Sequence, residues 1–108
     1  MKWTIDYYNQ SVYEEAKSLP KLISAKFEAI KMTEHGPDLG MPFTKSFGKG
    51  LFEIRAKAQE GIARGFYCTI SGQKIIILHV FVKKTQATPK KELDLARKRL
   101  SEVRNHDI

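Results

Sequence analysis

Hydrophobic and polar positions divide the chain into a helical first part and an extended second part. Residues 3–8 are rich in aromatic and β-favouring side chains and predict a short strand, after which Asn9 provides a polar helix start. Residues 11–19 predict a short helix. Pro20 suits the first turn of a second helix, which mixed apolar and charged residues continue to Thr33.

The second part follows a loop of about ten residues, which glycines and prolines between positions 36 and 42 predict. Residues 51–56 alternate between two faces, and we expect one face to be core and the other to be functional or wet. The first face carries Phe52, Ile54 and Ala56, and the second carries Leu51, Glu53, Arg55 and Lys57. Residues 62–70 predict a second strand, and a turn over residues 71–73 leads into residues 74–82. The continuous β-branched character of that last run is typical of a central strand, and the three strands predict an antiparallel meander.

Thr88 and Pro89 predict the start of the last helix, as an N-cap residue and a proline in the first turn. Four apolar residues repeat at the spacing of one helix face: Leu93, Ala96, Leu100 and Val103. Five basic residues lie on the opposite face: Lys90, Lys91, Arg97, Lys98 and Arg104. This basic face either lies along RNA or is the wet side of an amphipathic helix. The order of elements predicts a small α+β fold, one domain over residues 1–108 with an N-terminal strand, two helices, an antiparallel sheet and a C-terminal helix.

Length and charge narrow the class of protein. The 108 residues suffice for one compact domain and disfavour a multidomain enzyme. Lysine and arginine number 19 against 12 acidic residues, and the formal charge of +7 is typical of a protein that meets polyanions. Residues 1–40 hold 5 basic and 6 acidic side chains, whereas residues 41–108 hold 14 and 6. We therefore expect nucleic acid as the partner, and its contact surface in the second part.

Several kinds of site and location are disfavoured by the sequence. Cys68 is the single cysteine, so we expect no internal disulfide, and no Cys/His spacing resembles a zinc site. The sequence contains no Gly-rich phosphate loop, serine nucleophile elbow or zinc-protease motif, and we expect no metal and no cofactor. The longest apolar run, residues 75–82, is much shorter than the roughly 20 residues of a membrane span. We expect a cytoplasmic protein with no membrane partner.

A set of cations marks one end of the predicted sheet. Arg55 and Lys57 come late in one strand, Arg64 lies near the start of the next, and Lys83 and Lys84 follow the third. In an antiparallel meander these positions meet at one end. The cluster is a solvated surface, a phosphate-binding site without chemistry, or a site for metal-free RNA cleavage. Cleavage needs a base for the 2′-hydroxyl, cations for the pentacoordinate phosphate and an acid for the 5′-oxygen, and arginine and lysine are suited to such roles.

Four stretches of the second part carry a family resemblance. They are Leu-Phe-Glu-Ile-Arg at residues 51–55, Ala-Arg-Gly-Phe-Tyr at 63–67, the run 77–89 and Ala-Arg at 96–97. The most specific is Phe-x-Lys-Lys-Thr-x-x-Thr-Pro at 81–89, which runs into a helix. In these stretches the chain resembles the phage-derived HigB-like branch of the RelE superfamily of toxins. The resemblance spans most of residues 45–105 and implies a RelE-like fold and a toxin of a type II toxin–antitoxin pair. The implied activity is ribosome-dependent endoribonuclease cleavage of mRNA in the A site.

The resemblance also implies roles for individual residues and a set of partners. Arg55 and Arg64 match the family's strand arginines and would contact the scissile phosphate or its neighbours. Lys83 and Lys84 match its paired lysines and would hold RNA phosphates, with one of them able to act as acid or base. Lys57 matches a position that often carries a basic or polar residue near the site. The implied partners are the ribosome with its mRNA and a HigA-like helix-turn-helix antitoxin, in a heterotetramer of two toxins and two antitoxins.

Two further side chains are open to two interpretations each. Alternation puts Tyr67 on the face opposite Arg64, which favours a core aromatic over an RNA-stacking residue. His79 lies in an apolar strand, on a face expected to include Ile75, Ile77 and Phe81, which favours a core histidine over a catalyst. Related toxins commonly use a Tyr or His near the C-terminus, where this chain has only His106, so the identity of the general base stays open.

The same features fit other functions. The alternative to the toxin is a non-catalytic RNA- or protein-binding module of phage origin that uses the same basic sheet. A third interpretation is a phage structural or regulatory protein whose positive charge serves assembly.

Overall fold

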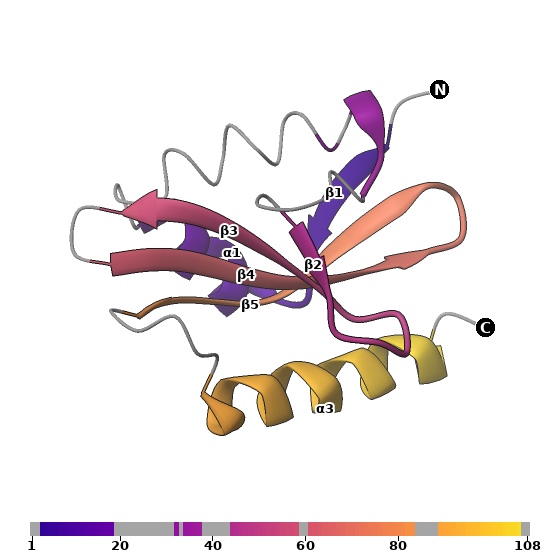
Figure 1. Cartoon of the computed structure of the whole chain (residues 1–108). Helices are drawn as coiled ribbons and strands as arrows, with labels where there is room; N and C mark the ends of the chain where they lie inside the picture. The colour runs from indigo at the N-terminus through magenta and orange to yellow at the C-terminus, as the bar shows by residue number, and fades with distance from the viewer. Residues whose placement is uncertain are drawn as a thin grey trace.

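The computed structural model describes residues 3–18, 32, 34–37, 44–58, 61–83 and 89–106, and gives the backbone alone at positions 18, 56–58, 61, 62, 83 and 106. In these residues five strands form one sheet, in the spatial order β1-β5-β4-β3-β2 (Figure 1). The elements are β1 (Thr4–Tyr7), α1 (Gln10–Ser18), β2 (Thr44–Ser46), β3 (Phe52–Ala58), β4 (Gly61–Ile70), β5 (Lys74–Lys83) and α3 (Lys90–His106). The predicted α+β fold is confirmed. Most of the helix predicted after Pro20 lies outside the described residues.

β5 lies inside the sheet, as its run of β-branched residues predicts. It pairs antiparallel with β4, which pairs antiparallel with β3, so the predicted meander is confirmed. On its other side β5 pairs in parallel with β1, from Thr4 opposite Lys74 to Tyr7 opposite Ile77. The sequence did not predict β2, which adds to the free side of β3. Its three residues are too few to show an alternating pattern.

Both described helices begin where their first residues can be capped. Asn9 Oδ1 accepts a hydrogen bond from the amide of Val12 at 2.9 Å, so Asn9 is the N-cap of α1. At the start of α3 the Pro89 carbonyl accepts hydrogen bonds from the amides of Glu92 and Leu93, at 3.1 and 3.2 Å. The helix starts predicted from Asn9 and from Pro89 are therefore confirmed to within two residues.

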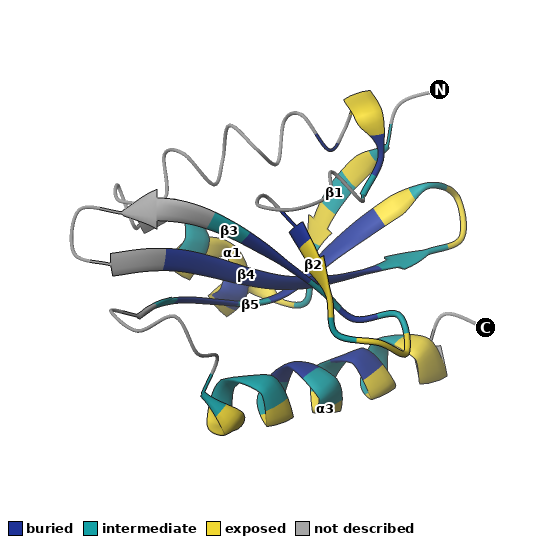
Figure 2. Ribbon diagram, in the orientation of Figure 1, coloured by how far each residue is buried: buried dark blue, intermediate teal, exposed yellow. Residues whose placement is uncertain are grey.

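Both faces of the central strands are buried, each under a different helix (Figure 2). The cluster on the α3 face consists of Leu51, Phe66, Cys68, Ile76, Leu78, Phe81, Ala96 and Leu100. The cluster on the opposite face consists of Val12 from α1, Met32, Ile54, Ala63, Tyr67, Ile75, Ile77 and Val80. The second face of residues 51–56 was expected to be functional or wet, and of these alternatives the wet one is wrong, because α3 folds back over that face. Among the described residues, no helix has the length and apolar character to cross a membrane.

A β-bulge at Leu78 changes which side chains of β5 face α3. The residues of β4 that lie opposite Ile77 and His79 are consecutive, so Leu78 is an extra residue without a partner position. Before the bulge, Ile75 and Ile77 belong to the core on the α1 side. Beyond it, His79 and Phe81 lie on the α3 side. The predicted shared face is therefore wrong, since strict alternation takes no account of the extra residue.

We predict that the hydroxyl of Tyr67 contributes measurably to stability. This side chain is buried, stacks on Phe52 with ring centroids 5.5 Å apart and donates a hydrogen bond to the Pro37 carbonyl. In Tyr67→Phe that carbonyl loses its donor, and we expect the free energy of unfolding to fall by about 1 to 2 kcal/mol in urea denaturation. Tyr13→Phe, at an exposed side chain, is the control and should change it by less than about 0.5 kcal/mol. Equal losses in the two variants would contradict the assignment.

Candidate phosphate-binding site

The cations expected at one end of the sheet occupy neighbouring backbone positions. Arg55 of β3 lies directly opposite Arg64 of β4. Two residues further toward the sheet end, Ile62 of β4 lies opposite Lys57 of β3 on one side and Lys83 of β5 on the other. The predicted convergence of these four positions is confirmed. Lys84 lies outside the described residues.

Glu53 stands between the two arginines and organises the site. It precedes Arg55 by two positions on β3, so both side chains lie on the α3 face. Arg55 Nε donates a hydrogen bond to Glu53 Oε1 at 2.5 Å, and Arg64 Nη1 lies 3.6 Å from Glu53 Oε2. Two guanidinium groups on directly opposed residues repel each other, and the shared carboxylate offsets that repulsion. The three side chains together retain one net positive charge.

Arg55 and Arg64 differ in their access to solvent. The side chain of Arg55 is 19% exposed, whereas those of Arg64 and Glu53 are fully buried. A phosphate that approaches from solvent therefore meets Arg55 first. The expectation that Arg64 contacts the phosphate directly does not fit this arrangement. Arg64 contacts the same carboxylate as the exposed guanidinium of Arg55.

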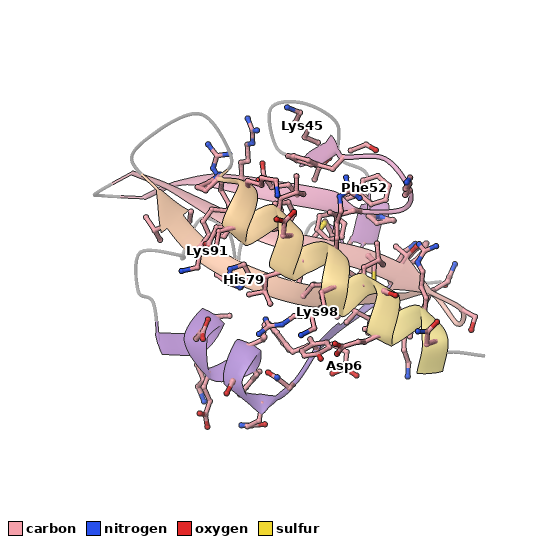
Figure 3. All side chains as sticks on the ribbon, turned by 90° about the horizontal axis from the view of Figure 1, so that it is seen from below. Asp6, Lys45, Phe52, His79, Lys91 and Lys98 are labelled. Atoms are coloured by element: carbon pink, nitrogen blue, oxygen red, sulfur yellow. The ribbon has the colours of Figure 1, made fainter. Side chains whose placement is uncertain are left out.

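His79 lies on the same face, beside the N-terminal half of α3, and pairs with a carboxylate of that helix (Figure 3). His79 Nε2 is 3.2 Å from Glu92 Oε2, and the two side chains are 12% and 16% exposed. The imidazole stacks on Phe81 at 5.4 Å between ring centroids, and Phe81 lies opposite Arg64. Among the described residues, the buried Nδ1 of His79 has no hydrogen-bond partner. The sequence predicted a core histidine, but it gave no sign that Glu92, 13 residues later, would be its partner.

The basic residues of α3 do not form one surface. Lys90, Lys91 and Lys98 are exposed, and a hydrogen bond from Lys90 to Asp94 raises the pKa of that lysine. Arg97 instead donates a hydrogen bond to the Phe47 carbonyl at 2.9 Å. The predicted five-residue basic face is therefore divided, because Arg97 anchors the helix to the segment that joins β2 and β3.

Arg104 lies at that same segment. Its guanidinium fills the space where a Cβ of Gly50 would stand, and Gly50 has a φ of +83°. Only glycine readily combines that backbone conformation with so close an approach. Arg104 is thus a second contact between the helix and the β2–β3 connection.

The remaining predicted site residue lies in the core. Tyr67 is fully buried on the face away from Arg64, as alternation predicts, and the structure does not place it where RNA can reach. Cys68 is a buried residue of the core on the α3 face. Within the described part of the chain, no group of three or more His, Cys, Asp or Glu side chains is arranged to hold a metal ion.

Both the sequence and the fold are similar to those of known proteins. The model of the family described as phage-derived protein Gp49-like (DUF891) matches residues 14–101. Among solved structures, a double mutant of the E. coli toxin RelE in the free state matches with a TM-score of 0.65 and 16% sequence identity, over 93% of this chain and 99% of that chain. No curated protein matches the sequence. At this identity the structural match establishes a shared fold, in agreement with the RelE-like architecture expected from the sequence.

We predict that the Glu53 carboxylate, which Arg55 and Arg64 share, contributes strongly to stability. In Glu53→Gln the buried Arg64 loses its negative partner, and we expect the free energy of unfolding to fall by about 3 kcal/mol or more. The double variant Glu53→Gln/Arg64→Gln should lose at least about 1 kcal/mol less than the sum of the single variants, because the second change removes the charge left behind by the first. Urea denaturation of all four proteins measures the difference. Strict additivity would show that the two groups do not interact.

Proposed function

This chain belongs to the phage-derived Gp49-like family and has the RelE fold, and from that premise we propose that it is an endoribonuclease toxin of a type II toxin–antitoxin pair. The structural relative is itself a toxin. The proposal places this chain in the HigB-like branch of the superfamily, with mRNA in the ribosomal A site as substrate. Its motifs at residues 51–55 and 81–89 support that placement.

The observation that carries the proposal is the orientation of Arg55. Its Nε is held by Glu53, so the guanidinium is fixed on one side, and the side chain is 19% exposed, so a second anion can approach it from solvent. A planar guanidinium binds a phosphate through two parallel hydrogen bonds. Phosphate bound there would be stabilised most when it becomes pentacoordinate and gains charge.

The reaction that suits such a site is an internal transesterification. The 2′-oxygen attacks the adjacent phosphorus, a P–O2′ bond forms and the P–O5′ bond breaks, which leaves a cyclic phosphate and a 5′-hydroxyl. A base takes the 2′-hydroxyl proton and an acid gives a proton to the departing 5′-oxygen. We assign these roles to Lys83 and Lys84.

The remaining basic residues are proposed to hold RNA and to bring the protein to the ribosome. Lys57 lies two residues beyond Arg55 on β3. Lys90, Lys91 and Lys98 are exposed on α3. Charges of this kind contribute through phosphate contacts and attraction at long range, with little dependence on base sequence. We further propose a HigA-like antitoxin as the protein that inactivates the toxin in a heterotetramer.

A second function is favoured by the burial of Arg64. One of the two arginines is inaccessible and Glu53 neutralises half of their charge, so the same face suits an RNA-binding module that holds a phosphate without cleaving it. The two functions differ in a single observable, the appearance of new RNA ends.

Inducible expression in a bacterial host tests the toxin directly. We expect growth arrest together with new 5′ ends in cellular mRNA, mapped by sequencing. Arg55→Ala should remove both effects and lower cleavage by purified protein on ribosomes about 100-fold or more, because the phosphate loses its exposed guanidinium. Lys74→Ala is the matched control, since this exposed lysine begins the strand whose other end carries Lys83. It should arrest growth as the parent chain does.

The outcomes separate the two functions. Arrest without new mRNA ends, or intact mRNA with a folded protein that still binds RNA, would replace the endoribonuclease with the binding module. Thermal unfolding of Arg55→Ala checks that a loss of activity does not come from loss of the fold.

The antitoxin has its own test. We expect co-expression of the adjacent reading frame to restore growth and to yield a co-purifying complex whose mass, by light scattering, fits two copies of each chain. Continued arrest with no complex would remove the type II pairing and leave the nuclease proposal standing.

A further inference from the structure

Two adjoining pockets lie at the end of the sheet away from Arg55. The larger has a volume of about 500 Å³ and is lined by Tyr7, Tyr8, Asn9, Ile70, Ile76, Glu102 and Val103. The smaller has a volume of about 270 Å³ and is lined by Asp6, Tyr7, Asn9, Gln10 and Tyr13. Tyr7 and Asn9 line both, so the two pockets adjoin along the end of β1 and the start of α1, and together they are called the groove. Each pocket contains one carboxylate.

The larger pocket combines an apolar floor with an oriented carboxylate. Ile70 and Ile76 come from the β4–β5 hairpin, and Val103 comes from the C-terminal half of α3. Tyr8 donates a hydrogen bond from its hydroxyl to Glu102 Oε2, and that bond raises the pKa of Tyr8. The hydroxyl therefore stays a donor and holds one carboxylate oxygen in place, which leaves Oε1 as an acceptor.

The smaller pocket is also aromatic and acidic. Tyr7 and Tyr13 meet edge to face at 5.1 Å between ring centroids. Tyr13 is 38% exposed and is the one large hydrophobic side chain that lies exposed in the described part of the chain. Asp6 is exposed and lines the same pocket. Exposed tyrosines are enriched at protein–protein interfaces, where a ring contributes contact area and its hydroxyl a hydrogen bond.

The segment that forms β1 and α1 differs in charge from the chain as a whole. The chain has a formal charge of +7, yet residues 4–18 contain three acidic residues and one basic residue. Arg99 lies over the Tyr8 ring at 4.9 Å and Lys17 over the Tyr13 ring at 5.7 Å. These two cations pack on the rings. In the described part of the chain, neither Arg99 nor Lys17 forms an ion pair with Asp6 or Glu102.

We propose that this groove binds a basic segment of a partner polypeptide, with a lysine or arginine side chain in the larger pocket. Its aliphatic stem lies on Ile70, Ile76 and Val103, and its cationic head pairs with Glu102. A second basic side chain of the same segment lies against the tyrosines beside Asp6. The groove does not suit RNA, because two carboxylates repel phosphate.

The groove is separate from the proposed phosphate site, and the inference does not rest on the proposed nuclease function. Ile76 and Lys83 are seven residues apart on β5, which corresponds to about 23 Å. A partner seated in the groove therefore leaves the cationic end of the sheet open.

A hexalysine peptide is the probe, followed by backbone amide NMR of the full chain. A protein of net charge +7 repels a polycation, so binding reports a local acidic site. We expect chemical-shift changes concentrated at Tyr7, Tyr8, Asn9 and Glu102, and none with hexaglutamine. Glu102→Gln should weaken binding roughly tenfold while its amide oxygen still accepts the Tyr8 hydrogen bond.

Glu34→Gln is the matched control, since Glu34 is exposed and lies outside both pockets. It should bind hexalysine as the parent chain does. No binding, shifts spread over all acidic residues, or equal weakening by the two substitutions would each overturn the proposal. An unchanged NMR spectrum of Glu102→Gln outside the groove confirms that the variant is folded.

Discussion

One buried carboxylate shared by two arginines is the constraint on which the candidate site depends. A guanidinium without exposed surface is tolerated only with a negative partner, and Glu53 provides it for Arg64 while also fixing Arg55. The layer between the sheet and α3 is therefore apolar over most of its area and ionic at one end. The two arginines and Glu53 together carry one net positive charge. That end of the layer can therefore attract an anion without burying two unpaired cations. The three side chains that stabilise this end of the layer are also those on which the proposed phosphate site depends.

α3 keeps this layer closed through contacts of two kinds. Its apolar stripe packs on the sheet, and polar side chains on both flanks fix its position. On one flank Arg99 donates a hydrogen bond to the Leu78 carbonyl at 2.7 Å, and on the other Arg97 reaches the Phe47 carbonyl. The bulge at Leu78 explains part of this arrangement, because it turns His79 toward Glu92. The helix thus extends from the end of the sheet that carries Arg55 to the groove at the other end.

Some features were predictable because they depend on neighbours in sequence. Alternation over residues 51–56 placed Glu53 and Arg55 on one face, and the β-branched run 74–82 indicated a central strand. Asn9 and Pro89 predicted helix starts, because each forms hydrogen bonds with residues three or four positions away. The parallel pairing of β1 with β5 had no such signal, since it joins residues 70 positions apart. Strict alternation also placed Ile75 and Ile77 on the same face as His79, which is wrong. The β-bulge at Leu78 adds one residue to the strand, and the composition of the strand gives no sign of it.

The sequence by itself determined the strands of the meander, the terminal helix and the end of the sheet at which four basic positions gather. These follow from periodicity and chain direction, which are local properties. Only the tertiary structure decided that α3 covers the face with the arginines, that Arg64 is buried while Arg55 is exposed, and that Glu92 meets His79. It also decided that Glu102 meets Tyr8, 94 positions away, to form the acidic groove. The physical reason is that burial and charge pairing depend on which distant surfaces pack together, and a pattern along one strand or helix contains no information about its partner.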